Sequence, residues 1–202
     1  MELSAKVVSL HEALALAKIE HAIGGAIALA YCIEEPRATR DVDINVFVGV
    51  KLAREVFEAL PRGVAWNERD LARCTRDAQI RLHWGEHPVD IFFMEHEFLV
   101  DARRHVVTVP FERAHIPVLG CVHLAVLKAF FARSKDWTDI EFMIQAGLNV
   151  AEVARWLTLL LGPNDERIAR LHELVRTLVP VEEPNFRRIL NESRRTRDLP
   201  SI

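Results

Sequence analysis

The alternation of apolar and polar residues is clearest over 41–48 (DVDINVFV), where one face carries Val42, Ile44, Val46 and Val48. Successive side chains of a strand point to opposite faces, so this segment predicts a half-buried β-strand. We expect further strands near 19–23, 78–84, 88–94 and 104–109, with a hairpin turn at Gly85-Glu86-His87.

A helical spacing of apolar residues dominates the rest of the chain. Leu10, Leu14 and Ala17 recur at i, i+4 and i+7, which predicts an amphipathic helix over 9–18. Further helices are expected from Gly25 to about Cys32 and over 51–60, 119–132, 136–146, 150–161, 165–178 and 185–194. This order predicts an α+β protein: an α/β core with a small mixed sheet over 1–112, and a helical region over 113–202 packed on that core.

Composition narrows the class of protein further. The 202 residues are 50% hydrophobic and 27% charged, which is ordinary for a globular chain and excludes wholesale disorder. A formal charge of −3 gives no global electrostatic case for binding nucleic acid or membranes. The longest apolar stretch, 22–33, is shorter than the ~20 residues that a bilayer span needs. The N-terminus also lacks the pattern of a signal peptide, so we expect a cytoplasmic protein without membrane association.

Two carboxylates lie on the best-defined predicted strand. Asp41 and Asp43 are two residues apart, so both project from the face opposite the valines. Neighbouring carboxylates repel unless a cation lies between them, and Mg²⁺ is commonly held by one or two carboxylates plus substrate phosphates. Two solvated acids at the start of a strand explain the spacing equally well. Asp90, in PVDIFF, faces away from the apolar row of its strand and joins the pair if the two strands are neighbours.

A glycine pair supplies a second feature of phosphate chemistry. Gly24-Gly25 follows a predicted strand and precedes a predicted helix, where backbone amides and the helix dipole can hold a phosphate. Glycine pairs serve ordinary turns more often. Together with three acids and divalent metal ions, however, such a turn completes the components of two-metal phosphoryl transfer.

The run GGAIALAYCIEEPRATRDVDINV resembles the signature of the nucleotidyltransferase superfamily, specifically its small bacterial AbiEii-like branch. The resemblance implies a polymerase-β-like core in which Asp41 and Asp43 hold metal ions and the triphosphate. It also implies that Asp90 is the third acid of the metal site and activates the acceptor hydroxyl, and that Gly24-Gly25 cradles the phosphates.

Further matches extend the resemblance over about 19–146. Arg37 and Thr39 match the RxT that precedes the acids in the family. AVLKAFFARSKDWTDIEFM resembles the family's downstream block, which implies nucleotide-binding roles for Lys128, Arg133 and Asp136. One departure is Ala26, because many relatives place Ser or Thr directly after the glycine pair, where the hydroxyl can meet a phosphate.

Two charged residues of the downstream block lie on apolar faces. Lys128 belongs to a predicted helix that is apolar nearly all round, so its ammonium must reach water or meet an anion. Asp136 falls on the buried face of the next helix. It either caps the start of that helix, orients Lys128 or Arg133, or contacts the nucleotide.

These features predict a Mg²⁺- or Mn²⁺-dependent enzyme that transfers a nucleoside monophosphate from an NTP to an acceptor hydroxyl. The resemblance implies RNA or protein as the acceptor and a toxin role with an antitoxin partner. The alternatives are an antibiotic-modifying enzyme, of aminoglycoside or lincosamide type, with a small-molecule acceptor, and a catalytically silent nucleotide-binding module, which Ala26 favours. The five arginines within 187–197 indicate either a solvated basic tail or a contact to a phosphate backbone.

Overall fold

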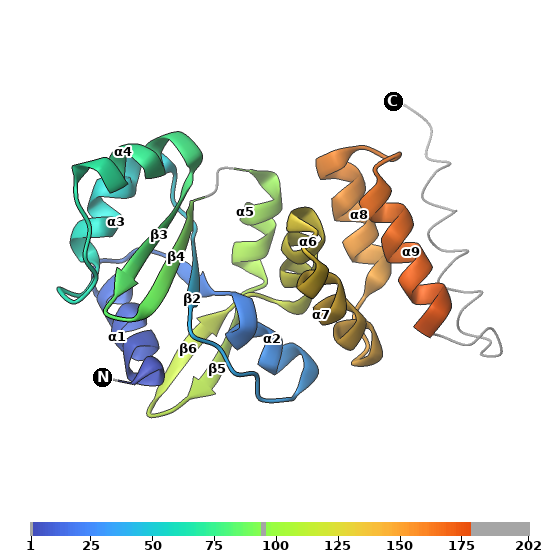
Figure 1. Ribbon diagram of the computed structural model, residues 1–202, viewed down its shortest axis with the longest axis horizontal. Helices are drawn as coiled ribbons and strands as arrows, with labels where there is room; N and C mark the ends of the chain where they lie inside the picture. The colour runs from blue at the N-terminus through green and yellow to red at the C-terminus, as the bar shows by residue number, and fades with distance from the viewer. Residues whose placement is uncertain (1, 94–95, 179–202) are drawn as a thin grey trace. The chain divides into compact units, whose positions relative to one another are not determined.

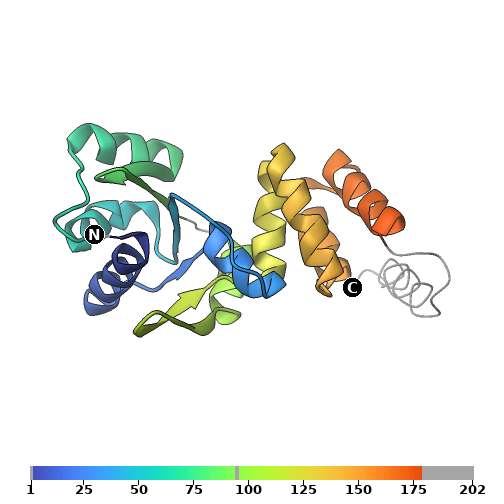
Figure 2. The same cartoon turned by 60° about the horizontal axis from the view of Figure 1, so that its bottom comes forward.

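The computed structural model describes residues 2–93 and 96–178, and these fall into two compact units that divide between Gly120 and Cys121 (Figures 1 and 2). The first unit combines a sheet with helices. Its elements are α1 (Leu3–Leu16), β1 (His21–Ile23), α2 (Gly25–Ile33), β2 (Val42–Val46), η1 (Val50–Leu52), α3 (Ala53–Ala59), α4 (Glu68–Asp77), β3 (Gln79–Trp84), β4 (His87–Phe93), α5 (Glu97–Arg104), β5 (Val107–Phe111) and β6 (Ala114–Val118).

The described strands form one mixed sheet in the order β3-β4-β2-β1-β6-β5. β2 runs parallel to β4 and antiparallel to β1, while β1 runs parallel to β6. The pairs β3-β4 and β5-β6 are antiparallel hairpins. Parallel neighbours need a crossover connection, and the chain between β2 and β4 passes through α3 and α4. The predicted α+β class with a small mixed sheet is confirmed.

The apolar alternation of β2 determines which face of the sheet is buried. Val42, Ile44 and Val46 are almost fully buried, and they are paired across the strands with Val89, Ile91 and Phe93 of β4, which are buried as well. The polar residues of both strands therefore project from the opposite face. This arrangement places Asp43 and Asp90 on one side of the sheet, away from that apolar row.

Several elements differ from the expectations. α4 carries a polar surface and buries only Cys74, so its apolar periodicity is too weak to mark it, although a capping box of Asn67 and Asp70 begins it. α5 and β6 were not expected either. The strand expected over 104–109 begins only at Val107, because α5 extends to Arg104.

The second unit is helical over its described residues. It consists of α6 (Cys121–Phe131), α7 (Ser134–Gln145), α8 (Val150–Leu161) and α9 (Glu166–Leu178). Trp137, Ile140, Leu157 and Leu171 are buried in this unit. The helix expected over 185–194 and the arginines of 187–197 lie outside the described residues. No helix among the described residues combines the length and the hydropathy that spanning a membrane requires.

Candidate functional site

Asp43 and Asp90 are direct partners across two neighbouring strands. The register of β2 and β4 aligns Val42 with Val89, Asp43 with Asp90 and Ile44 with Ile91. Aligned residues of a parallel pair project from the same face, so the two carboxylates are neighbours on one side of the sheet. From the sequence, Asp90 was expected to join Asp41 and Asp43 only if the two strands are neighbours. In the structure, β2 and β4 are neighbours.

Asp41 lies directly before β2 and its carboxylate is oriented by Thr39. The Thr39 hydroxyl donates a hydrogen bond to Asp41 Oδ1 at 2.7 Å, and the Asp41 amide lies 3.3 Å from the same hydroxyl oxygen. Arg37 is half-buried two residues earlier in the segment that leads into β2. The structure therefore gives Thr39 a role in positioning a carboxylate of the site.

A basic residue that the sequence analysis missed lies among the acids. Arg81 of β3 is paired in register with Asp90, and its Nε and Nη2 donate hydrogen bonds to the two Asp90 carboxylate oxygens at 2.7 and 2.6 Å. The same Nη2 is 3.8 Å from Asp41 Oδ2. The predicted hairpin could have revealed the contact between Arg81 and Asp90. Pairing Trp84 with His87 across the Gly85-Glu86 turn aligns residue 81 with residue 90.

The three carboxylates act on Arg81 electrostatically. Its hydrogen bonds to Asp90, followed by the charges of Asp90, Asp41 and Asp43, raise the pKa of the Arg81 guanidinium further above its usual value. The Arg81 side chain is 54% exposed, whereas that of Asp90 is only 12% exposed. An exposed cation thus covers a mostly buried carboxylate.

The glycine pair allows the backbone to approach the acidic residues closely. Gly25 has a φ of +55°, which favours glycine, and a Cβ on it would overlap Asp43 Oδ2. A Cβ on Gly24 would lie 2.7 Å from Asn45 Nδ2, and the Gly24 amide donates a hydrogen bond to the Asp43 carbonyl at 2.8 Å. The turn that begins α2 therefore lies against the Asp43 carboxylate.

Asn45 is a second residue that the sequence analysis missed. It follows Asp43 at a two-residue spacing on β2, so both side chains share one face. Asn45 is 2% exposed, and its Oδ1 has no hydrogen-bond partner among the described residues. A buried polar atom without a partner is uncommon in a native fold, which singles out this face of β2.

The donor set suits a hard divalent cation. Asp41, Asp43 and Asp90 offer carboxylate oxygens, which are the ligands that Mg²⁺ and Mn²⁺ prefer. Together with Arg81, the three acids have a formal charge of −2 (three negative charges and one positive). The absence of a side chain at Gly25 lets the turn lie directly against the Asp43 carboxylate. The residues of this face therefore fit the metal that the resemblance implies.

Lys128, Arg133 and Asp136 form ion pairs within the second unit. Lys128 is 8% exposed and its ammonium donates to Asp139 Oδ2 at 2.6 Å, with Asp136 Oδ1 at 3.8 Å. Asp136 is fully buried, and it accepts hydrogen bonds from the Arg133 amide at 3.2 Å and from Arg133 Nε at 2.7 Å. Lys128 thus meets anions rather than water, and Asp136 caps the start of α7.

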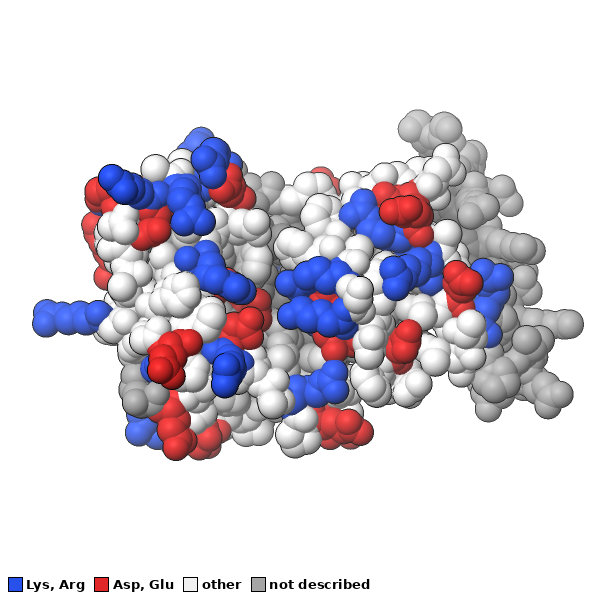
Figure 3. Space-filling view, in the orientation of Figure 1, with Lys and Arg blue, Asp and Glu red and all other residues white. Residues whose placement is uncertain are grey.

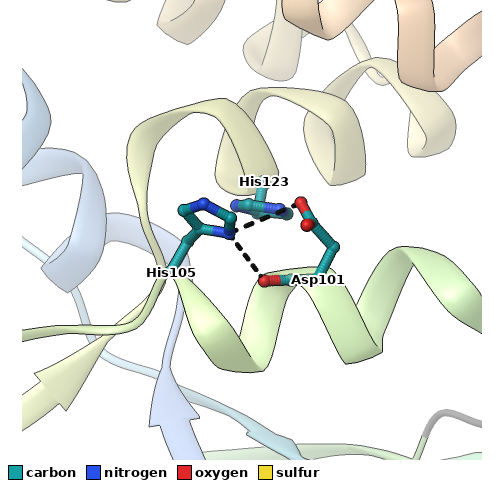
Figure 4. Close-up of side chains that lie close together, drawn as sticks. All are labelled: Asp101, His105 and His123. Carbon is teal, nitrogen blue, oxygen red and sulfur yellow. Dashed lines mark hydrogen bonds and ion pairs between the residues drawn. The ribbon is translucent and has the colours of Figure 1, made fainter.

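A smaller polar group lies on α5. Figure 4 shows Asp101 and His105 one helical turn apart. His105 Nδ1 lies 2.9 Å from the Asp101 carbonyl oxygen and 3.5 Å from the Asp101 carboxylate. His123, drawn in the same view, belongs to α6 of the second unit, where its ring centroid is 6.5 Å from that of Trp156. The α5 pair is an i, i+4 contact at the helix end, where a basic group suits the helix dipole.

Charges of both signs are interspersed over the visible face of the first unit. Figure 3 shows Lys and Arg next to Asp and Glu there, without a continuous field of one sign. Proteins that follow a nucleic-acid backbone usually present a basic stripe. This face of the first unit does not present one.

Comparison with solved structures identifies the fold. The antibiotic-resistance factor ANT(2'')-Ia is similar over 95% of this chain and 97% of its own, with a TM-score of 0.53 and 10% sequence identity. An antigenic nucleotidyltransferase-like protein from Paracoccidioides brasiliensis is similar over 93% of this chain and 92% of its own, with a TM-score of 0.51 and 14% identity. No family model and no curated sequence matches the chain at a significant level. At these identities the likeness establishes a nucleotidyltransferase fold.

Proposed function

We propose that this protein is a divalent-metal-dependent nucleotidyltransferase, which moves a nucleoside monophosphate from an NTP to an acceptor hydroxyl. The observation that carries the proposal is the register of β2 and β4, which pairs Asp43 directly with Asp90 beside the Gly24-Gly25 turn. Two like charges on adjacent strands repel each other, so this pairing does not stabilise the fold. On a nucleotidyltransferase fold, their convergence supports a site that binds metal and nucleotide.

Each residue of this face has a chemical task in the proposed reaction. Asp41 and Asp43 hold Mg²⁺ or Mn²⁺, and Thr39 keeps the Asp41 carboxylate oriented. Once bound, the metal neutralises charge on the phosphates and stabilises the attacking oxygen. Asp90 completes the metal site and accepts the proton of the acceptor hydroxyl. The amides at the start of α2, after Gly24, bind the phosphates.

The transfer breaks one bond for each bond that it forms. The acceptor oxygen forms a bond to the α-phosphorus, and the bond from that phosphorus to the bridging oxygen of the β-phosphate breaks. The electron pair leaves with pyrophosphate, while the proton of the acceptor moves to Asp90. Nucleotide-binding roles for Arg37, Lys128, Arg133 and Asp136 remain predictions. Within the second unit, the ion pairs of Lys128 and Asp136 already account for their burial.

A label-transfer assay tests the proposal. Each α-³²P-labelled NTP is incubated with the protein, Mg²⁺ and a mixture of acceptors, and the pyrophosphate released is measured in parallel. We expect transfer by the native protein and none by the double variant Asp41→Ala/Asp43→Ala. The double variant Asp77→Ala/Glu152→Ala removes the same charge from exposed ion pairs elsewhere and should retain the activity. Transfer that survives in the Asp41/Asp43 variant would refute the assignment of the metal site.

The acceptor class follows from the same assay. We propose RNA or protein as the acceptor, in a toxin that an antitoxin neutralises, as the AbiEii-like resemblance implies. Arrest of growth on expression, relieved by Asp41→Ala/Asp43→Ala, is the expected phenotype. Label found only on RNA or protein supports this class.

An antibiotic is the second candidate acceptor, supported by the fold shared with ANT(2'')-Ia. An acidic cleft would suit a polycationic aminoglycoside. Label found only on an added aminoglycoside would favour this candidate. Binding of NTP without transfer to any acceptor would instead favour a silent nucleotide-binding module.

A further inference from the structure

The Arg81 guanidinium contacts two of the three proposed metal ligands, Asp90 and Asp41. It binds both carboxylate oxygens of Asp90 and approaches Asp41 Oδ2 to 3.8 Å, so a single cation bridges two of the three acids. Paired donors in this fork geometry match a carboxylate well and hold it in one orientation. The acids are therefore already arranged around a positive charge that the chain itself supplies.

A divalent cation bound by the same acids competes with this contact. Carboxylate oxygens bind Mg²⁺ at about 2.0–2.1 Å, which places the ion close to the atoms that Arg81 contacts. A guanidinium held at that position repels the ion, since both are cations. Metal binding and the Arg81–Asp90 pair thus disfavour each other.

The position of Arg81 allows it to leave. β3 is at the edge of the described sheet, and the Arg81 side chain is 54% exposed. The long side chain can turn into solvent by rotating about its own bonds, without any change in the β3-β4 hairpin. Asp90, by contrast, is mostly buried on a strand with neighbours on both sides and keeps its place.

We propose that Arg81 is a positioning residue that acts as an exchangeable counter-cation. It holds Asp90 and Asp41 in place before the divalent ion binds, and it is displaced when the ion binds. The displacement frees the Asp90 oxygens for the metal and for the proton of the acceptor. This inference rests on the proposed function, because it assigns the metal to the Asp41, Asp43 and Asp90 group.

Binding of Mn²⁺ to the full chain without nucleotide tests the inference, with free Mn²⁺ measured by electron paramagnetic resonance. We expect Arg81→Gln to bind Mn²⁺ about threefold to tenfold more tightly than the native protein, since an ion pair of this exposure is worth at most about tenfold. Arg81→Lys keeps the charge but loses the fork, and should fall between the two. Arg54→Gln is the matched control, because Arg54 forms an exposed two-point pair with Glu68.

Each outcome of the measurement decides a stated claim. Binding by Arg81→Gln that is equal to or weaker than native, with Arg54→Gln unchanged, overturns the inference and leaves the proposed function intact. Equal Mn²⁺ binding by native protein and Asp41→Ala/Asp43→Ala, or no binding by any variant, overturns the metal site and the inference together. Circular dichroism checks that each variant is folded, and Arg81→Lys decides the question if Arg81→Gln does not fold.

Discussion

Asp43 and Asp90 face the same side of the sheet as a direct pair across β2 and β4, with the buried pairs Val42–Val89 and Ile44–Ile91 on either side of them along the strands. The apolar pairs anchor the register, because a slip of one residue would turn every side chain of β2 to the wrong face. The packing of the core thereby places the Asp43 and Asp90 carboxylates next to each other, although neither side chain lies on the apolar face. Four measurements test what this arrangement implies.

Replacing Asp43 should separate function from stability. Asp43→Asn removes a metal ligand, and we expect nucleotidyl transfer to fall by at least about 100-fold. The same change removes a like charge beside Asp90 and Asp41 but also one of the anions that act on Arg81, so the melting temperature should change little. Initial rates and thermal unfolding by circular dichroism measure the two effects. Asp77→Asn, at an exposed ion pair, is the control. A variant that melts earlier but keeps its activity would contradict the prediction.

A methyl group on Gly25 should damage the site as well as the backbone. Gly25→Ala places a side chain at a φ of +55°, which costs about 1–2 kcal/mol, and its Cβ overlaps the Asp43 carboxylate. Gly85→Ala is the matched control, since its φ is +62° and its Cβ would meet only Lys6 Nζ at 3.7 Å. We expect Gly25→Ala to lose more free energy of unfolding than Gly85→Ala and to weaken Mn²⁺ binding. Equal losses of unfolding free energy in the two variants, with unchanged Mn²⁺ binding, would show that the Asp43 side chain moves aside at little cost.

Stability should fall at mildly acidic pH through His11 and His21. Their rings are joined by a 3.0 Å contact between His11 Nδ1 and His21 Nε2, while His21 Nδ1 donates to the Ile19 carbonyl. Burial is the main cause that lowers the pKa of each histidine below 6.5. The unfolded chain therefore binds more protons than the folded chain as the pH falls below about 6.5.

This contribution to stability is complete above pH 6.5 and is lost as the pH falls through the folded-state values. Urea unfolding between pH 5 and pH 8 measures the slope. His21→Gln should flatten the slope in the range below pH 6.5, whereas His115→Gln, at an exposed histidine, should leave it unchanged. A native slope that persists in His21→Gln would assign the acid sensitivity to other groups.

Lys128 should be more important for stability than an exposed basic residue. Lys128→Met leaves Asp139, and the more buried Asp136, without this ammonium, and breaking a buried pair typically costs about 3–5 kcal/mol. Lys128→Met/Asp139→Leu removes both partners and should recover part of the loss. Arg155→Met, at the exposed pair with Glu152, should cost about 1 kcal/mol or less. Urea unfolding compares the three, and a Lys128→Met value no larger than that of Arg155→Met would contradict this account.

Prediction from the sequence succeeded where local periodicity is strong. β2, β4 and the described helices of the second unit have apolar rows of the right period, and each was expected close to its observed position. α4 was missed because its surface is polar and it buries only Cys74, so its helical form depends on capping and on packing against α3 and β3 rather than on an apolar face. β6 was missed because its short, proline-containing segment gains its partners only within the sheet.

The sequence by itself determined which side of β2 carries Asp41 and Asp43, because alternation along a strand is a local property with a period of two residues. Its glycine pair also marked the place where the backbone has to approach another group closely. Only the tertiary structure decided that β4 is the parallel neighbour of β2, that the register joins Asp43 to Asp90, and that Arg81 lies against the acids. Those relationships depend on which distant strands pack together, and that choice is made by the whole core rather than by any segment of the chain.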